Sequence, residues 1–270
     1  MAIAAGIEVY NVDSAPVVAR GITYSQDNLN SAISGPVAKI LKDNEGNIEL
    51  ETMLAGIAST DFEQSTLTSI LNTPQVINSW RVGEALAESY LVEHCDCYFP
   101  WTGSRDLKSS SVSPAGADLV GFKREKNDGE SFRFAFGEVK TSQENKYPPQ
   151  TMYGRHGMTK QLENLRNDKK MRNQLVRYLG HHAPRSDWSD KYRSATKSYL
   201  ADTTDVSLYG FLVRDVAPNK LDLESRAAVL ANNCPTATTI MLRAMYLPKE
   251  SIDKLKTLAI RAMEGKHVNN

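Results

Sequence analysis

The segments GADLVGF (residues 116–122) and FRFAFGEVK (residues 132–140) decide the fold of this chain. Between them lies Asn127-Asp128-Gly129, a strong signal for a tight turn between antiparallel strands. We therefore predict a β-hairpin. Because strand side chains alternate, Glu138 and Lys140 share a face with the phenylalanines of the second arm. That face is apolar and then becomes charged at the strand end, where a functional site is expected.

The charged residue types at the hairpin end suit phosphodiester hydrolysis. This reaction requires negative charge on the phosphoryl group to be stabilised and hydroxide to be produced near neutral pH. A hard cation such as Mg²⁺, with Mn²⁺ as an alternative, meets both needs and prefers oxygen ligands. We predict that Asp118, Glu138 and the backbone carbonyl of Val139 hold the ion and that Lys140 lies beside the attacking water. The competing interpretation of Glu138 and Lys140 is a surface salt bridge.

A helix predicted over about residues 74–93, with Thr73 as a possible N-cap, precedes the hairpin. It carries an apolar stripe with spacings of three and four, and a glutamate, Glu84, occupies one position of that stripe. The apolar members of the stripe are Ile77, Trp80, Ala87 and Leu91. A carboxylate on an apolar face must be paired, protonated or bound to a cation. We predict that Glu84 joins the site and holds a second ion; the alternative is a helix rotated so that Glu84 lies at the edge.

These residues resemble the PD-(D/E)xK, or restriction-endonuclease-like, nucleases. Members of that family carry an Asp on one strand, a (D/E)-x-K on the next, and often a Glu on a preceding helix. Asp118, Glu138, Lys140 and Glu84 match those positions, although Ala117 stands where the pattern has proline. The resemblance implies a nuclease core in which helices flank a mixed central sheet. It also implies a metal-dependent endodeoxyribonuclease.

The remaining pattern predicts an α/β protein with the order helix, three strands, helix, strand, strand, helix. The expected later elements are a long basic helix over residues 158–180, strands over 206–215 and 239–247, and a final helix over 249–265. We predict a nuclease core over residues 74–270. Residues 1–73 form an acidic, mainly helical elaboration, which either contacts a partner or completes the core as a buttress.

The charge distribution is uneven although the chain has 32 basic and 32 acidic residues, so net charge gives no support for nucleic-acid binding. Residues 154–185 contain eight basic and two acidic residues, a local candidate for a phosphate-binding face. The candidate DNA contacts are Arg155, His156, Lys160 and Gln161. Gln161 resembles the glutamine that follows the catalytic lysine in RecB-like members. Helix capping and surface polarity are the competing explanations.

Cysteine usage and hydropathy favour a cytoplasmic protein. The three cysteines offer no disulfide framework, and we interpret Cys95 and Cys97 as buried small hydrophobes. The N-terminus has no basic region followed by a long apolar run. No segment approaches the ~20 apolar residues that a membrane span needs.

A narrower resemblance runs over most of the chain, including the GEVK and GRHG segments, to the HamA family of nuclease subunits from Hachiman antiphage defence. It implies an effector that degrades DNA with little sequence specificity. It also implies a helicase partner, HamB-like, that restrains the nuclease until infection or DNA damage is sensed. Two alternatives stay open: a sequence-specific restriction-type endonuclease, and a catalytically silent binding subunit.

Overall fold

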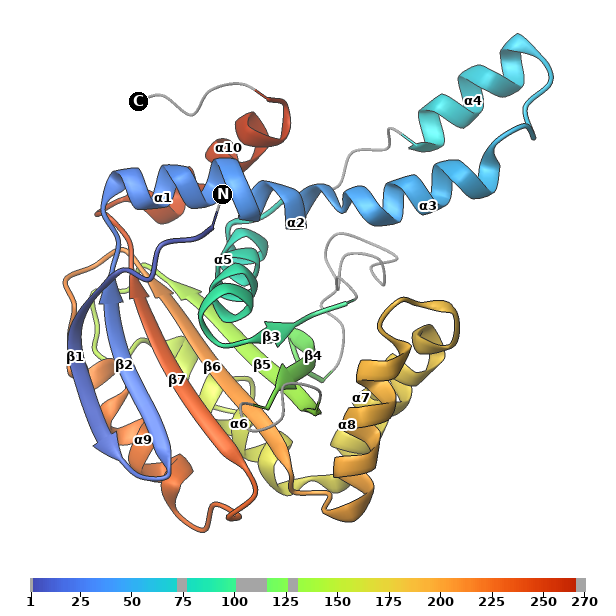
Figure 1. Ribbon diagram of the computed structural model, residues 1–270. Helices are drawn as coiled ribbons and strands as arrows, with labels where there is room; N and C mark the ends of the chain where they lie inside the picture. Colours follow the sequence, from blue (N-terminus) through green and yellow to red (C-terminus); the bar gives the residue numbers. More distant parts are fainter. Residues whose placement is uncertain (1, 72–76, 101–115, 126–130, 266–270) are drawn as a thin grey trace.

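The computed structural model describes residues 2–71, 77–100, 116–125 and 131–265. A seven-stranded mixed sheet with helices on both faces forms its centre (Figure 1). The strand order is β1-β2-β7-β6-β5-β4-β3. The strands are β1 Ile7–Ser14, β2 Val17–Thr23, β3 Cys97–Tyr98, β4 Leu119–Arg124, β5 Phe132–Ser142, β6 Val206–Arg214 and β7 Thr239–Tyr246. The predicted α/β class, with helices flanking a mixed sheet, is confirmed.

The centre of the sheet is parallel and its edges are antiparallel. β2, β7, β6 and β5 run parallel, whereas β1 pairs antiparallel with β2, and β4 with both β5 and β3. The pairing of β4 with β5 confirms the predicted hairpin, and its turn residues, 127–129, lie outside the described residues. β6 is buried along its whole length, as expected for a central parallel strand covered on both faces.

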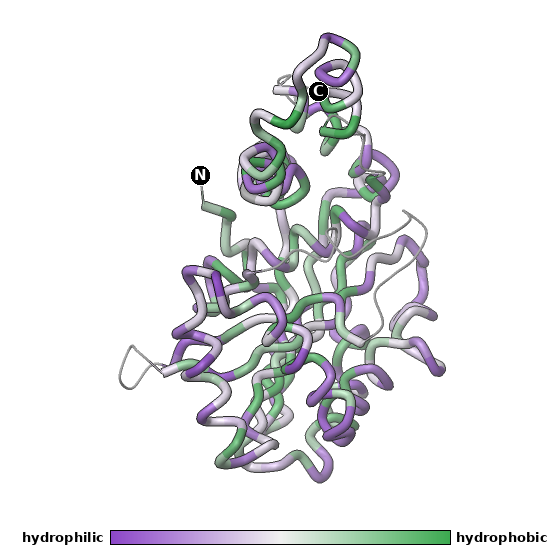
Figure 2. Tube along the Cα trace, turned by 90° about the vertical axis from the view of Figure 1, so that its right-hand side faces the viewer, coloured by the Kyte–Doolittle hydropathy of each residue, from purple (hydrophilic) through white to green (hydrophobic). Residues whose placement is uncertain are grey.

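Each face of the sheet packs against its own set of helices. One core contains residues of α1 Gln26–Ala32, α2 Ala38–Lys42, α5 Ser79–His94 and α10 Ser251–Met263, together with Val139 of β5. The other contains residues of α6 Met158–Asn167, α7 Lys169–His182, α8 Ser189–Ala201 and α9 Glu224–Ala231, together with the phenylalanines of β5. Figure 2 shows hydrophobic segments along the strands in the interior and hydrophilic segments on the outer helices.

The N-terminal segment departs from the mainly helical elaboration that the sequence predicts. β1 and β2 extend the central sheet, because the β2 edge pairs with β7 over the full length of β2. α1, the π-helix η1 Ile33–Val37 and α2 then continue as a long helix across the top of the molecule (Figure 1). Their buried side chains Leu29, Ile33, Val37 and Leu41 join the core beside α5. Residues 2–42 therefore form part of the sheet and of the hydrophobic core, and are not a peripheral addition to them.

Two predicted helices have different bounds in the structure. α5 begins at Ser79 after Asn78 rather than near residue 74, and residues 72–76 lie outside the described part of the chain. The helix predicted over 158–180 is interrupted at Asp168, whose carboxylate accepts hydrogen bonds from the backbone N–H groups of Lys170 and Met171. This side chain caps the N-terminus of α7 and so ends α6. None of the helices in the described ranges is long and apolar enough to cross a membrane.

Candidate active site

The site lies at the start of β4, beside the part of β5 that β4 does not cover. Pairing between the two strands begins at Leu119 and Gly137, but β5 continues to Ser142. Asp118 directly precedes β4, and its Oδ2 accepts a hydrogen bond of 2.7 Å from the Val139 N–H. The Asp118 side chain thus occupies the edge of β5 that β4 no longer covers. Because the N–H and C=O of one strand residue point to the same edge, the Val139 carbonyl faces that edge too.

Glu138 and Lys140 lie on one face of β5, as strand alternation predicts. Lys140 Nζ lies 2.6 Å from Glu138 Oε1, and Glu138 is only 5% exposed. Glu138 pairs in register with Gly210, where an added Cβ would lie 2.8 Å from Leu162 Cδ1. The carboxylate therefore lies on the face covered by α6. The Glu138 carboxylate is buried and the Lys140 side chain is 23% exposed, so the pair differs from a fully exposed salt bridge at the protein surface.

α5 brings Glu84 to the same region. Glu84 is 9% exposed, and its Oε2 lies 2.9 Å from Nη1 of Arg81. The predicted apolar stripe holds at Ala87 and Leu91, both buried, but is wrong at Trp80, which is 37% exposed. The reason is that the middle of α5 is buried on nearly every side, so the buried surface is wider than one stripe. The alternative of Glu84 at an exposed edge does not match its burial.

A glycine permits the close approach of α5 to the sheet. A Cβ at Gly83 would lie 2.2 Å from Oγ1 of Thr141 on β5, which is closer than any side chain allows. Thr141 Oγ1 is buried and has no hydrogen-bond partner among the described residues. The packing of Gly83 on Thr141 therefore sets the distance between α5 and β5, and with it the position of Glu84.

Asp118 raises the pKa values of the two glutamates, Glu84 and Glu138, both of which are buried. Burial, followed by the negative charge of Asp118, raises the pKa of Glu84 to about 8, against the opposing charge of Arg81. Burial and Asp118 likewise raise the pKa of Glu138 to about 7, against the opposing charge of Lys140. Asp118 is therefore the carboxylate that interacts electrostatically with both Glu84 and Glu138.

Asp118 and Lys140 complete this electrostatic cluster. Burial raises the pKa of Asp118, although the hydrogen bond from the Val139 N–H and the nearby cations oppose the shift. Burial lowers the pKa of Lys140, but the negative charges of Glu138, Asp118 and Glu84 outweigh it, so the net shift is upward. Lys140 is therefore a fixed positive charge among the carboxylates.

The chemistry of this donor set fits an oxygen-preferring divalent cation. In the side-chain conformations of this structure, no group of three His, Cys, Asp or Glu residues among the described residues is arranged to hold a metal ion. Lys140 contacts Glu138, and Arg81 contacts Glu84. Asp118 and Glu138 nevertheless offer carboxylates beside Val139, and a divalent cation would offset the negative charge of Asp118 that raises the pKa of Glu138. The residues that could hold it are Asp118, Glu138, Val139 through its carbonyl, and Glu84.

Arg81 is a site residue that the sequence interpretation missed. Its Nη1 pairs with Glu84, and its buried Nη2 has no hydrogen-bond partner among the described residues. Arg81 also lowers the pKa of Asp118. The available signal was its spacing, because Arg81 stands three residues before Glu84 and neighbours at this spacing meet on a helix. A buried guanidinium N–H without an acceptor can receive an anionic oxygen of a ligand.

The predicted DNA contacts lie in the turn before α6 and in the first turns of α6. Arg155 and His156 are exposed in the turn before α6, and Lys160 is exposed and lies 3.5 Å from Glu163. Gln161 is half-buried in the first turns of α6, beside Leu162, which packs over the strand next to Glu138. Among the described residues, no hydrogen bond or ion pair joins Arg155 or His156 to the cluster.

Two of the eight basic residues in 154–185 have a structural role instead. Arg166 donates to the backbone carbonyls of Leu230 and Asn232. Arg172 donates to those of Leu165, Arg166 and Thr203, and both guanidinium groups are buried. The predicted basic surface is accordingly smaller than the sequence count indicates.

No protein-family model and no curated protein sequence matches the chain. The fold and site define an α/β protein with a seven-stranded mixed sheet and a buried or half-buried cluster of charged residues at the edge of β5. That cluster consists of Arg81, Glu84, Asp118, Glu138 and Lys140.

Proposed function

We propose that the chain is a metal-dependent endodeoxyribonuclease of the PD-(D/E)xK class. The observation that carries the proposal is the group formed by buried Glu138 with half-buried Asp118 and Lys140 at the end of the β4–β5 pairing, together with Glu84 of α5. Burying several carboxylates together costs free energy unless a cation compensates them. Folding does not require such an arrangement, whereas metal-dependent phosphodiester hydrolysis uses carboxylates of this kind to hold its cation.

Each residue has a role in this proposal. Asp118, Glu138 and the Val139 carbonyl would hold Mg²⁺ or Mn²⁺, with Glu84 available to a second ion. A bound ion supplies positive charge against the phosphoryl oxygens and lowers the pKa of water. Lys140 keeps its proton at Nζ and stabilises the negative charge that develops during attack.

Arg81 adds a second cationic group to this scheme. Its Nη2 is buried and has no acceptor among the described residues, so a phosphate oxygen that reached it would supply the missing acceptor, while its Nη1 pairs with Glu84. In this proposal Arg81 both holds the Glu84 carboxylate in position and binds a phosphate group of the substrate.

The substrate and the partner follow from the resemblance to Hachiman nuclease subunits. We propose that the substrate is DNA, cut with little sequence specificity, and that a HamB-like helicase restrains the enzyme until activation. The arm formed by α3 Asn44–Leu54 and α4 Asp61–Leu71 supports a partner contact, because it projects from the core (Figure 1). Residues 43–80 contain six acidic and no basic residues, which suits a basic partner surface.

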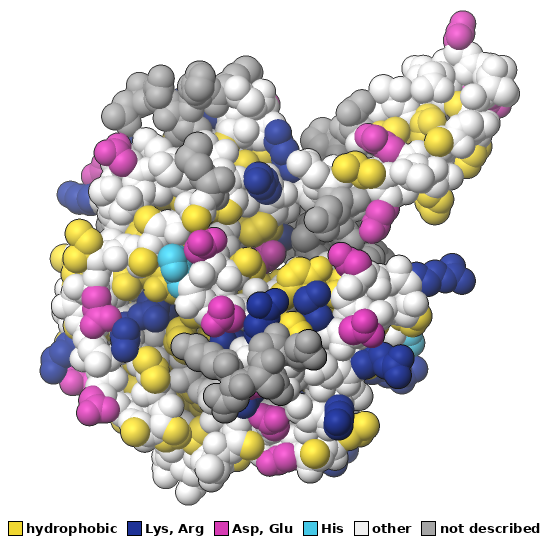
Figure 3. All heavy atoms as spheres, in the orientation of Figure 1, with side chains coloured by type: hydrophobic (Ala, Val, Ile, Leu, Met, Phe, Trp, Pro, Cys, Tyr) yellow, Lys and Arg dark blue, Asp and Glu magenta, His cyan; other side chains and the backbone are white. Residues whose placement is uncertain are grey.

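The arm also exposes apolar side chains that its own helices do not cover. Phe62 is 81% exposed, and α4 has no buried residue. Hydrophobic side chains along the arm are visible in Figure 3 beside acidic ones. The exposed apolar residues of the arm are Ile48, Met53, Ile57, Phe62 and Ile70. An exposed apolar surface of this kind is typical of a protein interface.

The test of the enzyme proposal is cleavage of supercoiled plasmid with Mg²⁺ or Mn²⁺, with and without the helicase partner and ATP. Wild type should nick or degrade the DNA, and Glu138→Gln/Lys140→Ala should lose activity on the order of 10²-fold or more. The matched control is Glu224→Gln/Lys220→Ala, which removes an exposed ion pair of 2.9 Å at the start of α9. Absence of cutting by wild type in every condition would favour the silent binding subunit.

The partner proposal has a separate test. Wild type and the helicase should co-elute in size-exclusion chromatography, and Phe62→Glu on the arm should weaken the complex. Because Phe62 is exposed, this variant should keep the melting temperature of wild type. Co-elution of Phe62→Glu at wild-type affinity would place the contact elsewhere.

A further inference from the structure

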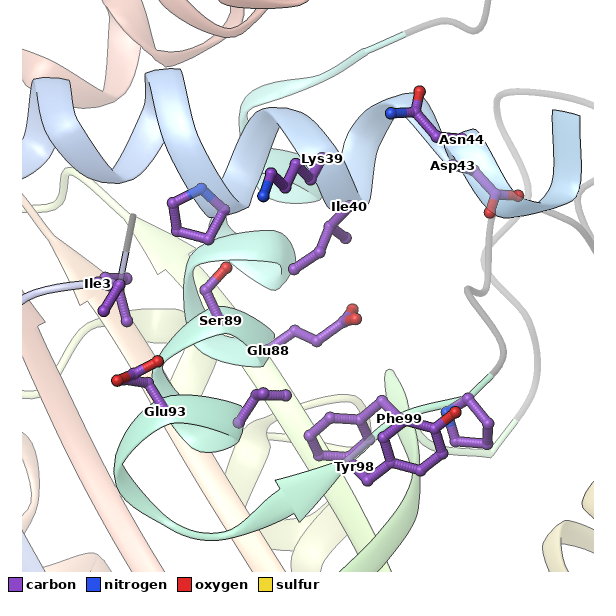
Figure 4. A pocket seen from close by; sticks show the side chains of 14 residues that line it. Ile3, Lys39, Ile40, Asp43, Asn44, Glu88, Ser89, Glu93, Tyr98 and Phe99 are labelled. Atoms are coloured by element: carbon purple, nitrogen blue, oxygen red, sulfur yellow. The ribbon is translucent and has the colours of Figure 1, made fainter. Parts of the chain in front are cut away.

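A cavity of about 440 Å³ lies between α2, α5 and the segment that contains β3 (Figure 4). Its volume is in the range of small-molecule pockets, ~300–1,000 Å³. It does not include Asp118, Glu138 or Lys140, so it is distinct from the candidate active site. Its lining comes from four parts of the chain that tertiary packing brings together.

Glu88 points into the middle of this cavity (Figure 4). It is only 7% exposed, yet within the described part of the chain its carboxylate accepts no hydrogen bond and forms no ion pair. Burial raises its pKa to about 7, with the charge of Arg81 opposing and that of Asp43 adding to the shift. A buried carboxylate without a partner is costly, and a ligand that carries a positive charge removes that cost.

The rest of the lining favours a cation over an anion. Glu93 adds a second acidic group to Glu88, and Lys39 is the one basic residue among the described lining. Lys39 is exposed at the rim and does not pair with Glu88. A phosphate or carboxylate ligand would meet net negative charge. A cation would be attracted to it.

The apolar part of the cavity suits the stem of such a cation. The rings of Tyr98 and Phe99 lie below Glu88 in Figure 4, and Ile40 lies above it. Long cationic side chains and amines bury an apolar stem while the charged end finds a counter-ion. Aromatic rings also attract guanidinium and ammonium groups through their π-faces.

We propose that this cavity binds a guanidinium or ammonium group carried on an apolar stem, with Glu88 as its counter-ion. The proposal does not rest on the proposed nuclease function. The same chemistry has two sources, a free small cation and an arginine or lysine side chain of a polypeptide, and two probes separate them.

The test is isothermal titration of the full chain with agmatine and with a blocked tripeptide that has a central arginine. Butylurea, uncharged and of similar length, is the ligand control. At least one cationic probe should bind with a Kd at or below about 1 mM. Agmatine alone would assign a free cation, and the tripeptide alone a polypeptide side chain. Binding of both would show that the charged group by itself determines recognition.

Variants connect any binding to Glu88. Glu88→Gln should weaken binding at least about 10-fold, because it keeps the shape and removes the charge. The Glu88→Gln variant should fold, because the substitution removes a buried charge. Its melting temperature should be at least that of wild type. Lys39→Glu at the exposed rim should strengthen binding several-fold. Asp253→Asn on α10, exposed and outside the cavity, should change nothing. The proposal is overturned if neither cationic probe binds wild type at about 10 mM, or if Glu88→Gln binds as tightly as wild type.

Discussion

The backbone N–H of Val139 donates a hydrogen bond of 2.7 Å to the carboxylate of Asp118. β4 does not pair with β5 beyond Gly137. The Asp118 carboxylate therefore accepts the hydrogen bond from Val139 that a neighbouring strand would otherwise accept. Asp118 therefore accepts a hydrogen bond from the edge of β5 and also contributes a negative charge to the candidate site. Substitutions at Asp118 can separate these two roles.

Asp118→Asn should abolish plasmid cleavage while leaving the fold intact. The asparagine oxygen still accepts the Val139 N–H, but the charge needed to hold a cation is lost. We expect activity to fall on the order of 10²-fold or more, with a melting temperature at or above that of wild type. Asp118→Ala should lose activity and also about 1–3 kcal/mol of stability, because it leaves the N–H unsatisfied. Equal melting temperatures for the two variants would contradict the structural role.

Gly83→Ala should destabilise the protein by about 1–3 kcal/mol, because the new Cβ would meet Thr141 Oγ1 at 2.2 Å. Thr141→Ala alone should cost little, since that oxygen has no partner among the described residues. The double variant should recover most of the lost stability, because the Cβ of residue 141 lies at 3.5 Å, an ordinary contact distance. Urea unfolding of the four proteins measures this cycle, and additive effects would show that the packing of α5 on β5 is not the cause.

Metal-free protein should become less stable as the pH rises from about 5 to 8. Glu84 and Glu138 have folded pKa values of about 8 and about 7, above their ordinary value of 4.5. Their contribution to stability is complete below the unfolded pKa and is lost as the pH rises through the folded values. In EDTA, the melting temperature should fall by several degrees over this interval, and less so in Glu84→Gln and Glu138→Gln.

Added Mg²⁺ provides the complementary measurement. Cations compete with protons for carboxylates, so Mg²⁺ should raise the melting temperature more at pH 8 than at pH 6. The effect should disappear in Asp118→Asn. A Mg²⁺ shift that is independent of pH and of Asp118 would mean that the ion binds elsewhere.

Arg155→Ala and Lys160→Ala should each weaken DNA binding. Both side chains are exposed near the start of α6, and removing one interaction with a phosphate should reduce the slope of log K against log salt by roughly one unit. The measurement is fluorescence anisotropy with duplex DNA on an inactive Glu138→Gln background. Lys249→Ala, an exposed lysine beyond β7, is the control. Unchanged slopes in both variants would exclude this turn from the DNA-binding surface.

The sequence by itself determined the local features of this protein. The hairpin arms, the two later strands and the final helix follow from periodicity and turn residues, because these depend on neighbours in the chain. Strand alternation likewise placed Glu138 and Lys140 on one face. The aspartate cap that divides the predicted helix at Asp168 was also readable, since Asp is a preferred N-cap residue, but continuous apolar spacing masked it.

Only the tertiary structure decided which residues meet. Pairing of β2 with β7 joins the N-terminal segment to the central sheet over more than 200 residues of chain, and no local pattern specifies such a partner. Burial of Arg81 beside Glu84, and of Arg166 and Arg172 on backbone carbonyls, depends on what packs against each helix. The cavity around Glu88 likewise forms from segments distant in sequence. Sequence periodicity indicates whether a helix face is buried or exposed. Long-range packing determines which segment of the chain covers that face.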